Sequence, residues 1–199
     1  RGVLTILPLF VIAGVVLSCM HQSSLGTLMV IAPTKLSAFW YTPWLPVLFL
    51  LSAIMIGFPM VIIESIFSAR SFGREPEMEI LEPLARIIPW TIGVYAVFKI
   101  ATLIAVADRL DTHLHHGCTT ALTIEFVAGL AVQFVMLIFR GVRRSPGWLF
   151  TASILLVFGV VLNRLNVFLV GFHPQTAGPT YFPSVGEIAV TTSIVAFLA

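Results

Sequence analysis

The sequence predicts an all-α protein, a polytopic bundle of transmembrane helices with about six spans. First, 58% of the 199 residues are hydrophobic and only 10% are charged, whereas about a quarter of a soluble domain is charged. Second, several apolar runs reach the roughly 20 residues that a helix needs to cross a bilayer core of about 30 Å. Third, these runs are continuous instead of alternating, which favours helices over the strands of a membrane barrel.

Six apolar runs mark the expected spans in order along the chain. They cover residues 2–20, 44–63, 87–107, 119–139, 148–172 and 185–199. Prolines, which break helices, occupy most of the connections: Pro33, Pro43, Pro76, Pro83, Pro146, Pro174, Pro179 and Pro183. Since the chain starts at Arg1 and stops at Ala199 within an apolar run, we expect a single integral membrane domain over residues 1–199 that is truncated at both ends.

The positive charges of the connections are unevenly divided between the two sides of the membrane. One side holds Arg1, Arg70, Arg74, Arg86, Arg140, Arg143 and Arg144, and the other holds Lys35 and Arg109, with Arg164 nearby. Because cytoplasmic loops carry the excess of positive charge, we expect the first side to be cytoplasmic and the protein to lie in the inner (cytoplasmic) membrane. Four glutamates of that side are expected in a solvated loop: Glu75, Glu77, Glu79 and Glu82.

Five ionisable residues fall at membrane depth in the expected outer half. At 1.5 Å per residue, Lys99, Glu125 and Arg164 lie roughly 20–24 Å from the cytoplasmic ends of their runs. Asp108 closes the third run and Glu187 enters the sixth. Ionisable residues in a membrane are costly, so these five are functional candidates.

Polar residues also form one stripe on each of two neighbouring spans. The stripes consist of Thr91, Tyr95, Lys99 and Thr102, and of Glu125, Gly129 and Gln133. They should face each other or a wet cavity, with the glycine allowing another helix to come close. A Lys99–Glu125 ion pair is the simplest arrangement, and the alternative is that this pair only fixes helix packing. Arg164 is expected to pair with Glu187; snorkelling outward or holding a ligand are its alternatives.

The end of the first run suits a quinone. Met20–Ser24 changes abruptly from apolar to hydrogen-bonding residues. A quinone needs an apolar channel for its tail and donors that hold its head carbonyls while protons arrive or leave. His21 and Gln22 supply such donors. All five histidines fall on the expected outer side: His21, His113, His115, His116 and His173. Chemistry that handles protons near neutral pH would therefore lie at the outer face. The alternative is that the loop histidines are simply solvated.

Three segments resemble the motifs of one family of membrane subunits. Met20–Met29 is similar to its MHQSS-x-G-x-LM segment, Gly57–Ser65 to its GF-x-x-VIFEG segment, and Tyr181–Glu187 to its YFP-T/S-x-x-E segment. Their order and approximate spacing agree across nearly the whole chain. The chain therefore resembles the NrfD/PsrC family of polysulfide reductase-type membrane subunits, and within it the hydrogenase-2-type (HybB) subunits.

The resemblance implies a helical subunit that passes electrons between an iron–sulfur partner subunit on the outer face and menaquinone in the membrane, with no haem or metal of its own. In the hydrogenase version, a periplasmic nickel–iron enzyme oxidises hydrogen and the electrons reduce menaquinone. Family members are also thought to couple this transfer to proton movement. The earlier family helices, which should help to form the quinone site, are expected to be missing from this chain.

The candidate site residues follow from the polar residues at membrane depth and from the family resemblance. We expect quinone-binding or proton-handling roles for His21, Gln22, Asp108, Glu125, Arg164 and Glu187, a proton pathway through Lys99 and Glu64, and no metal ligand. The resemblance implies functional roles for His21, Glu64 and Glu187, because these residues match motif positions of the family. Glu125 resembles a family glutamate. The match is weaker at 163–165, where the family often has a tryptophan before the arginine.

Other functions stay open. A b-type cytochrome needs axial histidines inside facing helices, which the expected spans lack, although His21 with a loop histidine could hold one outer haem. A membrane anchor of a molybdopterin or polysulfide reductase-type complex would also belong to this family. A proton-coupled transporter would use Lys99 and Glu125 as a relay, but such folds favour repeats and broken helices. The electron donor, the quinone type, the direction of electron flow and any proton pumping are also open.

Overall fold

The computed structural model describes the chain except residues 1, 32–35, 37–39, 108–115, 172–183 and 199. Its described part is helical, without a β-strand. The elements are α1 Gly2–Ile31, α2 Leu45–Ser71, α3 Met78–Ala107, α4 His116–Phe126, η1 Val127–Ala131, α5 Val132–Ile138, α6 Arg140–Arg144, α7 Pro146–Leu165, η2 Asn166–Val170 and α8 Val185–Leu198, where η marks a π-helix. The all-α class is confirmed.

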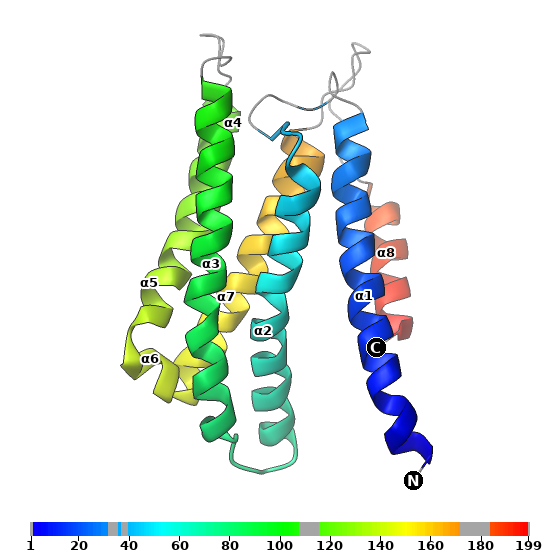
Figure 1. Cartoon of the computed structure of the whole chain (residues 1–199), viewed down its shortest axis with the longest axis vertical. Helices are drawn as coiled ribbons and strands as arrows, with labels where there is room; N and C mark the ends of the chain where they lie inside the picture. The colour runs from blue at the N-terminus through cyan, green and yellow to red at the C-terminus, as the bar shows by residue number, and fades with distance from the viewer. Residues whose placement is uncertain (1, 32–35, 37–39, 108–115, 172–183, 199) are drawn as a thin grey trace.

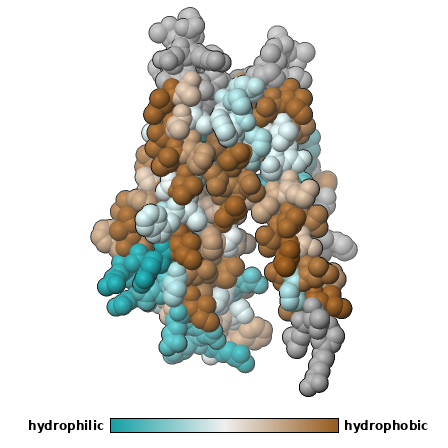
Figure 2. All heavy atoms as spheres, viewed as in Figure 1, coloured by the Kyte–Doolittle hydropathy of each residue, from teal (hydrophilic) through white to brown (hydrophobic). Residues whose placement is uncertain are grey.

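Five helical stretches are long and apolar enough to cross a membrane. They are Ile6–Ile31, Leu45–Ser71, Met78–Ala105, Thr120–Ile138 and Pro146–Leu169. These stretches correspond to the first five expected spans, and the sixth expected run is helical over Val185–Leu198. The outside is as apolar as a lipid-facing surface requires: Figure 2 shows hydrophobic side chains over much of the bundle and hydrophilic ones gathered around α6 and the nearby helix ends.

The predicted end of the first span at residue 20 is wrong. The helix α1 continues to Ile31 and includes His21 and Gln22. The polar residues do not break it, because a hydroxyl can bond to the backbone of the preceding turn. Thr27 Oγ1 does so, donating to the Ser23 carbonyl at 3.0 Å.

The helices α2, α3, α4–η1–α5 and α7 pack into a bundle, and α1 diverges from it toward its N-terminus (Figure 1). The main core lies between α2, α3, α5 and α7 and includes Met55, Ile62, Ile88, Leu137 and Leu156, all fully buried. A second, smaller core surrounds Trp40, Phe49 and Val167, and α1 contributes Leu25 and Met29 to it. Near that core α1 touches α2 closely, since a Cβ on Gly26 would lie 2.7 Å from Pro46 Cα.

Two glycines let α7 approach the fourth span. A Cβ on Gly159 would lie 2.6 Å from Gly129 Cα, which is closer than real Cβ contacts. The predicted close approach of another helix at Gly129 is therefore confirmed. The contact places the polar residues of the two helices side by side.

The arginine-rich end is held by backbone contacts and an ion pair. Arg143 is buried and its Nη1 donates to the Leu137 and Ile138 carbonyls at 2.6 and 3.0 Å. Arg144 Nε lies 3.5 Å from Glu82 Oε1. The prediction of a loop at Glu79 and Glu82 is thus wrong, since both belong to the first turns of α3, where acidic residues suit the helix dipole.

Candidate functional site

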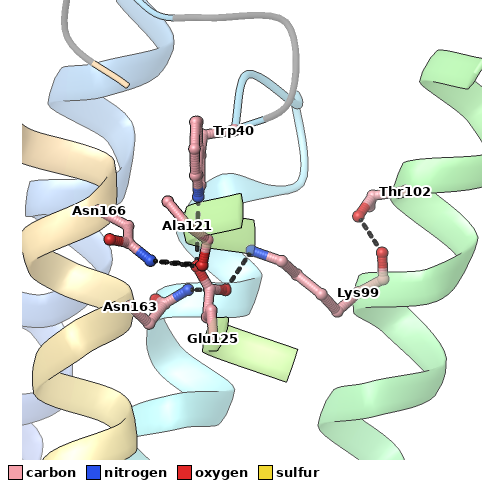
Figure 3. Close-up of polar contacts among 7 residues, drawn as sticks. All are labelled: Trp40, Lys99, Thr102, Ala121, Glu125, Asn163 and Asn166. Carbon is pink, nitrogen blue, oxygen red and sulfur yellow. Dashed lines mark hydrogen bonds and ion pairs between the residues drawn. The ribbon is translucent and has the colours of Figure 1, made fainter. Parts of the chain in front are cut away.

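A buried carboxylate forms the centre of the candidate site. The side chain of Glu125 is only 2% exposed. Its Oε1 forms an ion pair with Lys99 Nζ at 3.1 Å and accepts a hydrogen bond from Asn163 Nδ2 at 2.5 Å. Its Oε2 accepts hydrogen bonds from Trp40 Nε1 at 3.3 Å and Asn166 Nδ2 at 3.2 Å (Figure 3). We call these five residues the Glu125 cluster. A charge can be buried only when it is paired and hydrogen-bonded, and this one is held by four donors.

The four donors come from three segments that lie far apart in the sequence. Lys99 lies on α3, Asn163 on α7, Asn166 at the start of η2, and Trp40 in the segment before α2 (Figure 3). The predicted Lys99–Glu125 ion pair is confirmed. The cluster therefore fixes three helices and a connecting segment relative to one another.

Both π-helices adjoin the cluster. The first begins two residues after Glu125, and the second begins at Asn166 itself. A π-helix has i→i+5 backbone hydrogen bonds in place of the i→i+4 bonds of an α-helix. Such segments occur frequently at functional sites. In this chain the fully buried Gln133 donates its Nε2 to the Ala128 carbonyl inside η1, at 2.5 Å.

The predicted pairing of Arg164 with Glu187 is wrong. Arg164 Nη2 donates to Ser52 Oγ at 2.6 Å and to the Phe49 carbonyl at 3.2 Å, and the guanidinium lies 3.4 Å from the centre of the Phe49 ring. The reason is local: Arg164 faces α2, whereas Glu187 accepts the Ser184 N–H at 2.8 Å in a capping box at the start of α8.

A small cavity connects the surroundings of Arg164 with the Glu125 cluster. It has a volume of about 10 Å³, near the lower limit for one water molecule. Its lining consists of Ser52, Met55, Tyr95, Glu125, Gly129, Leu130, Gly159, Val160 and Asn163. Tyr95 is buried and lines this cavity together with Glu125. The cavity thus brings the Glu125 carboxylate, the Tyr95 phenol and the Asn163 amide to one space that could hold about one water molecule.

Among the residues that the structure describes, the predicted site residues His21, Gln22 and Glu64 do not join this cluster. His21 is exposed on α1, in a shallow groove of about 200 Å³ with Ser24 and Leu28. Gln22 follows it and is half-buried, and Glu64 is exposed on α2. Four further residues lie outside the described part of the chain: Asp108, His113, His115 and His173. The structure therefore separates the first-span candidates from Glu125.

Sequence reasoning missed three residues of the site. Trp40 lies in a connection, where no periodicity applies, and Phe49 contributes a backbone carbonyl and a ring face. Ser52 is one of the few polar residues of an apolar span, which is the one available hint. Among the described residues, no group of three histidines, cysteines or carboxylates has the arrangement of a metal site.

A family profile matches most of the chain. The family described as Polysulphide reductase, NrfD matches residues 4–173. The chain belongs to the NrfD family. The resemblance that the three motif segments carry is thereby confirmed.

The NrfD chain has relatives named as parts of different complexes. It is 30% identical to a "Probable Ni/Fe-hydrogenase 2 b-type cytochrome subunit" of Escherichia coli, over 94% of this chain and 48% of that protein. It is 25% identical to a putative dimethyl sulfoxide reductase membrane subunit of Halobacterium salinarum, over 78% of this chain and 43% of that protein. It is 26% identical to the "Menaquinone reductase, integral membrane subunit" of Nitratidesulfovibrio vulgaris, over 97% of this chain and 51% of that protein. The chain thus spans about half the length of these relatives, and no solved structure matches it significantly.

Proposed function

We propose that this NrfD chain belongs to a membrane subunit of a respiratory complex in the inner membrane, which passes electrons between an iron–sulfur partner subunit and menaquinone. The Glu125 cluster is the observation that carries the proposal, because ionisable residues buried in a membrane helix bundle are costly and mark substrate or proton pathways. The names of two relatives support it, since one is a hydrogenase subunit and the other a menaquinone reductase subunit. We propose a periplasmic nickel–iron hydrogenase as the electron donor.

Reduction of a quinone to a quinol takes up two electrons and two protons. In our proposal the iron–sulfur partner delivers the electrons, and the protons reach the head carbonyls from titratable groups of the bundle. Glu125 and Lys99 are the proposed proton-handling pair, and the amides of Asn163 and Asn166 orient Glu125 through hydrogen bonds. Arg164 remains a proposed quinone-binding or proton-handling residue. His21 and Gln22 remain proposed quinone contacts on α1, separate from that pair.

Isolation of the complex tests this function. The full-length subunit should be tagged and purified from native membranes in mild detergent, and the co-purifying subunits identified by mass spectrometry. We expect an iron–sulfur subunit and a nickel–iron subunit, together with hydrogen-dependent reduction of a menaquinone analogue. A purified complex that binds no iron–sulfur subunit and reduces no quinone would refute the proposal.

A molybdopterin enzyme is the second candidate partner. The similarity to a dimethyl sulfoxide reductase membrane subunit favours it. In that case the same purification should yield a molybdopterin-containing subunit, and electrons would flow from menaquinol to the enzyme.

A further inference from the structure

Three exposed arginines lie where α6 packs against α3. Arg86 belongs to α3, and Arg140 and Arg144 lie one turn apart on α6 (Figure 1). The two helices are joined by the ion pair of Arg144 with Glu82, which lies one turn before Arg86. We call Arg86, Arg140 and Arg144 the arginine corner. The surface around α6 is hydrophilic, in contrast to most of the bundle (Figure 2).

A fourth arginine fixes the position of α6. Arg143 is buried, and its Nη1 donates to the Leu137 and Ile138 carbonyls at the end of α5. Arg140 and Arg144 are four residues apart, so they share one face of the short helix, and both are exposed. The two exposed guanidinium groups are therefore presented by an element that is tied to the end of a membrane span.

The arginine corner carries more positive charge than its neighbours neutralise. Among the described residues, Arg86 and Arg140 form no ion pair. The pair of Arg144 with Glu82 is 3.5 Å long, and 66% of the arginine side chain is exposed. Such an exposed pair contributes little, so Arg144 can also bind a further anion. Even with Glu79 counted beside Glu82, three positive charges stand against two negative ones.

Apolar surface begins directly beside these arginines. Trp90, which is 77% exposed, follows Arg86 by one turn and lies about 6 Å further into the span. Ile138 and Phe139, which are 50% and 61% exposed, directly precede Arg140. The helices that carry Trp90 and Ile138 are long and apolar enough to cross a membrane. A ligand with an anionic head and apolar chains would contact both kinds of surface at once, whereas a soluble partner would reach the arginines alone.

We propose that the arginine corner binds the head group of an anionic phospholipid such as phosphatidylglycerol, with the acyl chains against Trp90, Ile138 and Phe139. Guanidinium groups bind phosphate oxygens in a bidentate manner, and basic sites between membrane helices suit anionic head groups. The indole of Trp90 suits the same depth, because tryptophan is enriched where the head groups meet the apolar core. A zwitterionic lipid has the same chains, but its ammonium group offsets the phosphate charge, so the corner prefers the anionic lipid.

Native mass spectrometry of the purified complex tests this preference. The complex that contains the full-length subunit is titrated with phosphatidylglycerol or phosphatidylethanolamine of identical acyl chains. The variants are Arg86→Gln and Arg140→Gln, and the matched control is Arg74→Gln, which removes an exposed arginine from a polar hollow beside Glu75 and Glu77. We expect each of the first two variants to weaken phosphatidylglycerol binding about fivefold, and the control to leave it unchanged. Binding of phosphatidylethanolamine should stay weaker and the same in all four proteins.

Two results of this titration would overturn the proposal. One is equal affinity of the wild-type complex for both lipids, and the other is an equal loss of affinity in Arg74→Gln. Inorganic phosphate is the third probe, and we expect it not to displace the lipid, because it makes no apolar contact. Displacement by phosphate would identify a site for the free anion and would also overturn the proposal. The readout is lipid binding, so it does not depend on quinone reduction.

Fluorescence provides a measurement that needs no arginine variant. The complex is placed in phosphatidylcholine bilayers that contain phosphatidylglycerol or phosphatidylethanolamine with brominated acyl chains, which quench nearby indoles. The difference in emission between the wild type and Trp90→Phe isolates the signal of Trp90. We expect this signal to be quenched more by the brominated phosphatidylglycerol. Equal quenching by both lipids would show that no anionic lipid is held at the corner.

Discussion

The Glu125 cluster and the His21 face of α1 are two polar regions built in opposite ways. In the cluster, the polar groups are held by partners from other elements, and Glu125 alone has four. On α1, His21 is exposed, and the residues that line its groove all belong to its own helix. A polar residue in an apolar run can therefore be part of the architecture or an addition to its surface. Substitutions should separate the two.

The largest effect is expected where a charge is left alone. Glu125→Ala leaves Lys99, exposed by 5%, without its counter-ion. Removing one partner of a buried pair costs about 3–5 kcal/mol. We expect a loss of that size in the free energy of unfolding, measured by titration with sodium dodecyl sulfate in mixed micelles.

A double variant controls for the size change. Lys99→Met combined with Glu125→Leu removes both charges and should recover a large part of the lost stability, because a buried pair can often be replaced by apolar residues. If the double variant is less stable than Glu125→Ala, the ion pair is not the reason for the loss.

The next effect concerns the helix contact that supports the cluster. Gly159→Ala places a Cβ against the backbone of Gly129 and should push the helices apart, at a cost of about 1–3 kcal/mol. The same measurement on Gly57→Ala is the control, because an added Cβ has free space there and alanine favours a helix. Equal stabilities of the two variants would contradict the close contact.

A single hydrogen bond should have a smaller effect. Trp40→Phe keeps the ring in the second core but removes the Nε1 donor from Glu125 Oε2. Hydrogen bonds to charged groups contribute about 1.5–3 kcal/mol, and the 3.3 Å distance places this one near the lower limit. The same titration measures the loss, and a loss above that of Glu125→Ala would show that packing of the indole dominates.

The smallest effect on stability is expected at His21. His21→Ala removes an exposed side chain and should change the free energy of unfolding by less than about 0.5 kcal/mol. If His21 contacts the quinone, hydrogen-dependent menaquinone reduction should slow, while reduction of an artificial dye by the partner enzyme persists. Unchanged menaquinone reduction would remove His21 from the proposed site.

Part of the candidate site was predictable from spacing. Lys99 and Glu125 each lie on a polar stripe of a long apolar helix, and two such stripes have few ways to avoid lipid except by meeting. Arg164 was predictable as a charge at membrane depth but its partners were not, since a guanidinium can bond to carbonyls and hydroxyls that carry no charge pattern. The end of α1 was missed because serine and threonine can satisfy their hydroxyls within a helix.

The sequence by itself determined the all-α class, the approximate places of five spans and the NrfD motifs, because apolar run length and local motifs are properties of consecutive residues. Only the tertiary structure decided which polar groups share one site. It brings Trp40, Asn163 and Asn166 to Glu125, and it leaves His21 outside. The reason is that hydrogen bonds in a bundle depend on the rotation and approach of whole helices, here through the contact of Gly129 with Gly159, and not on any local spacing.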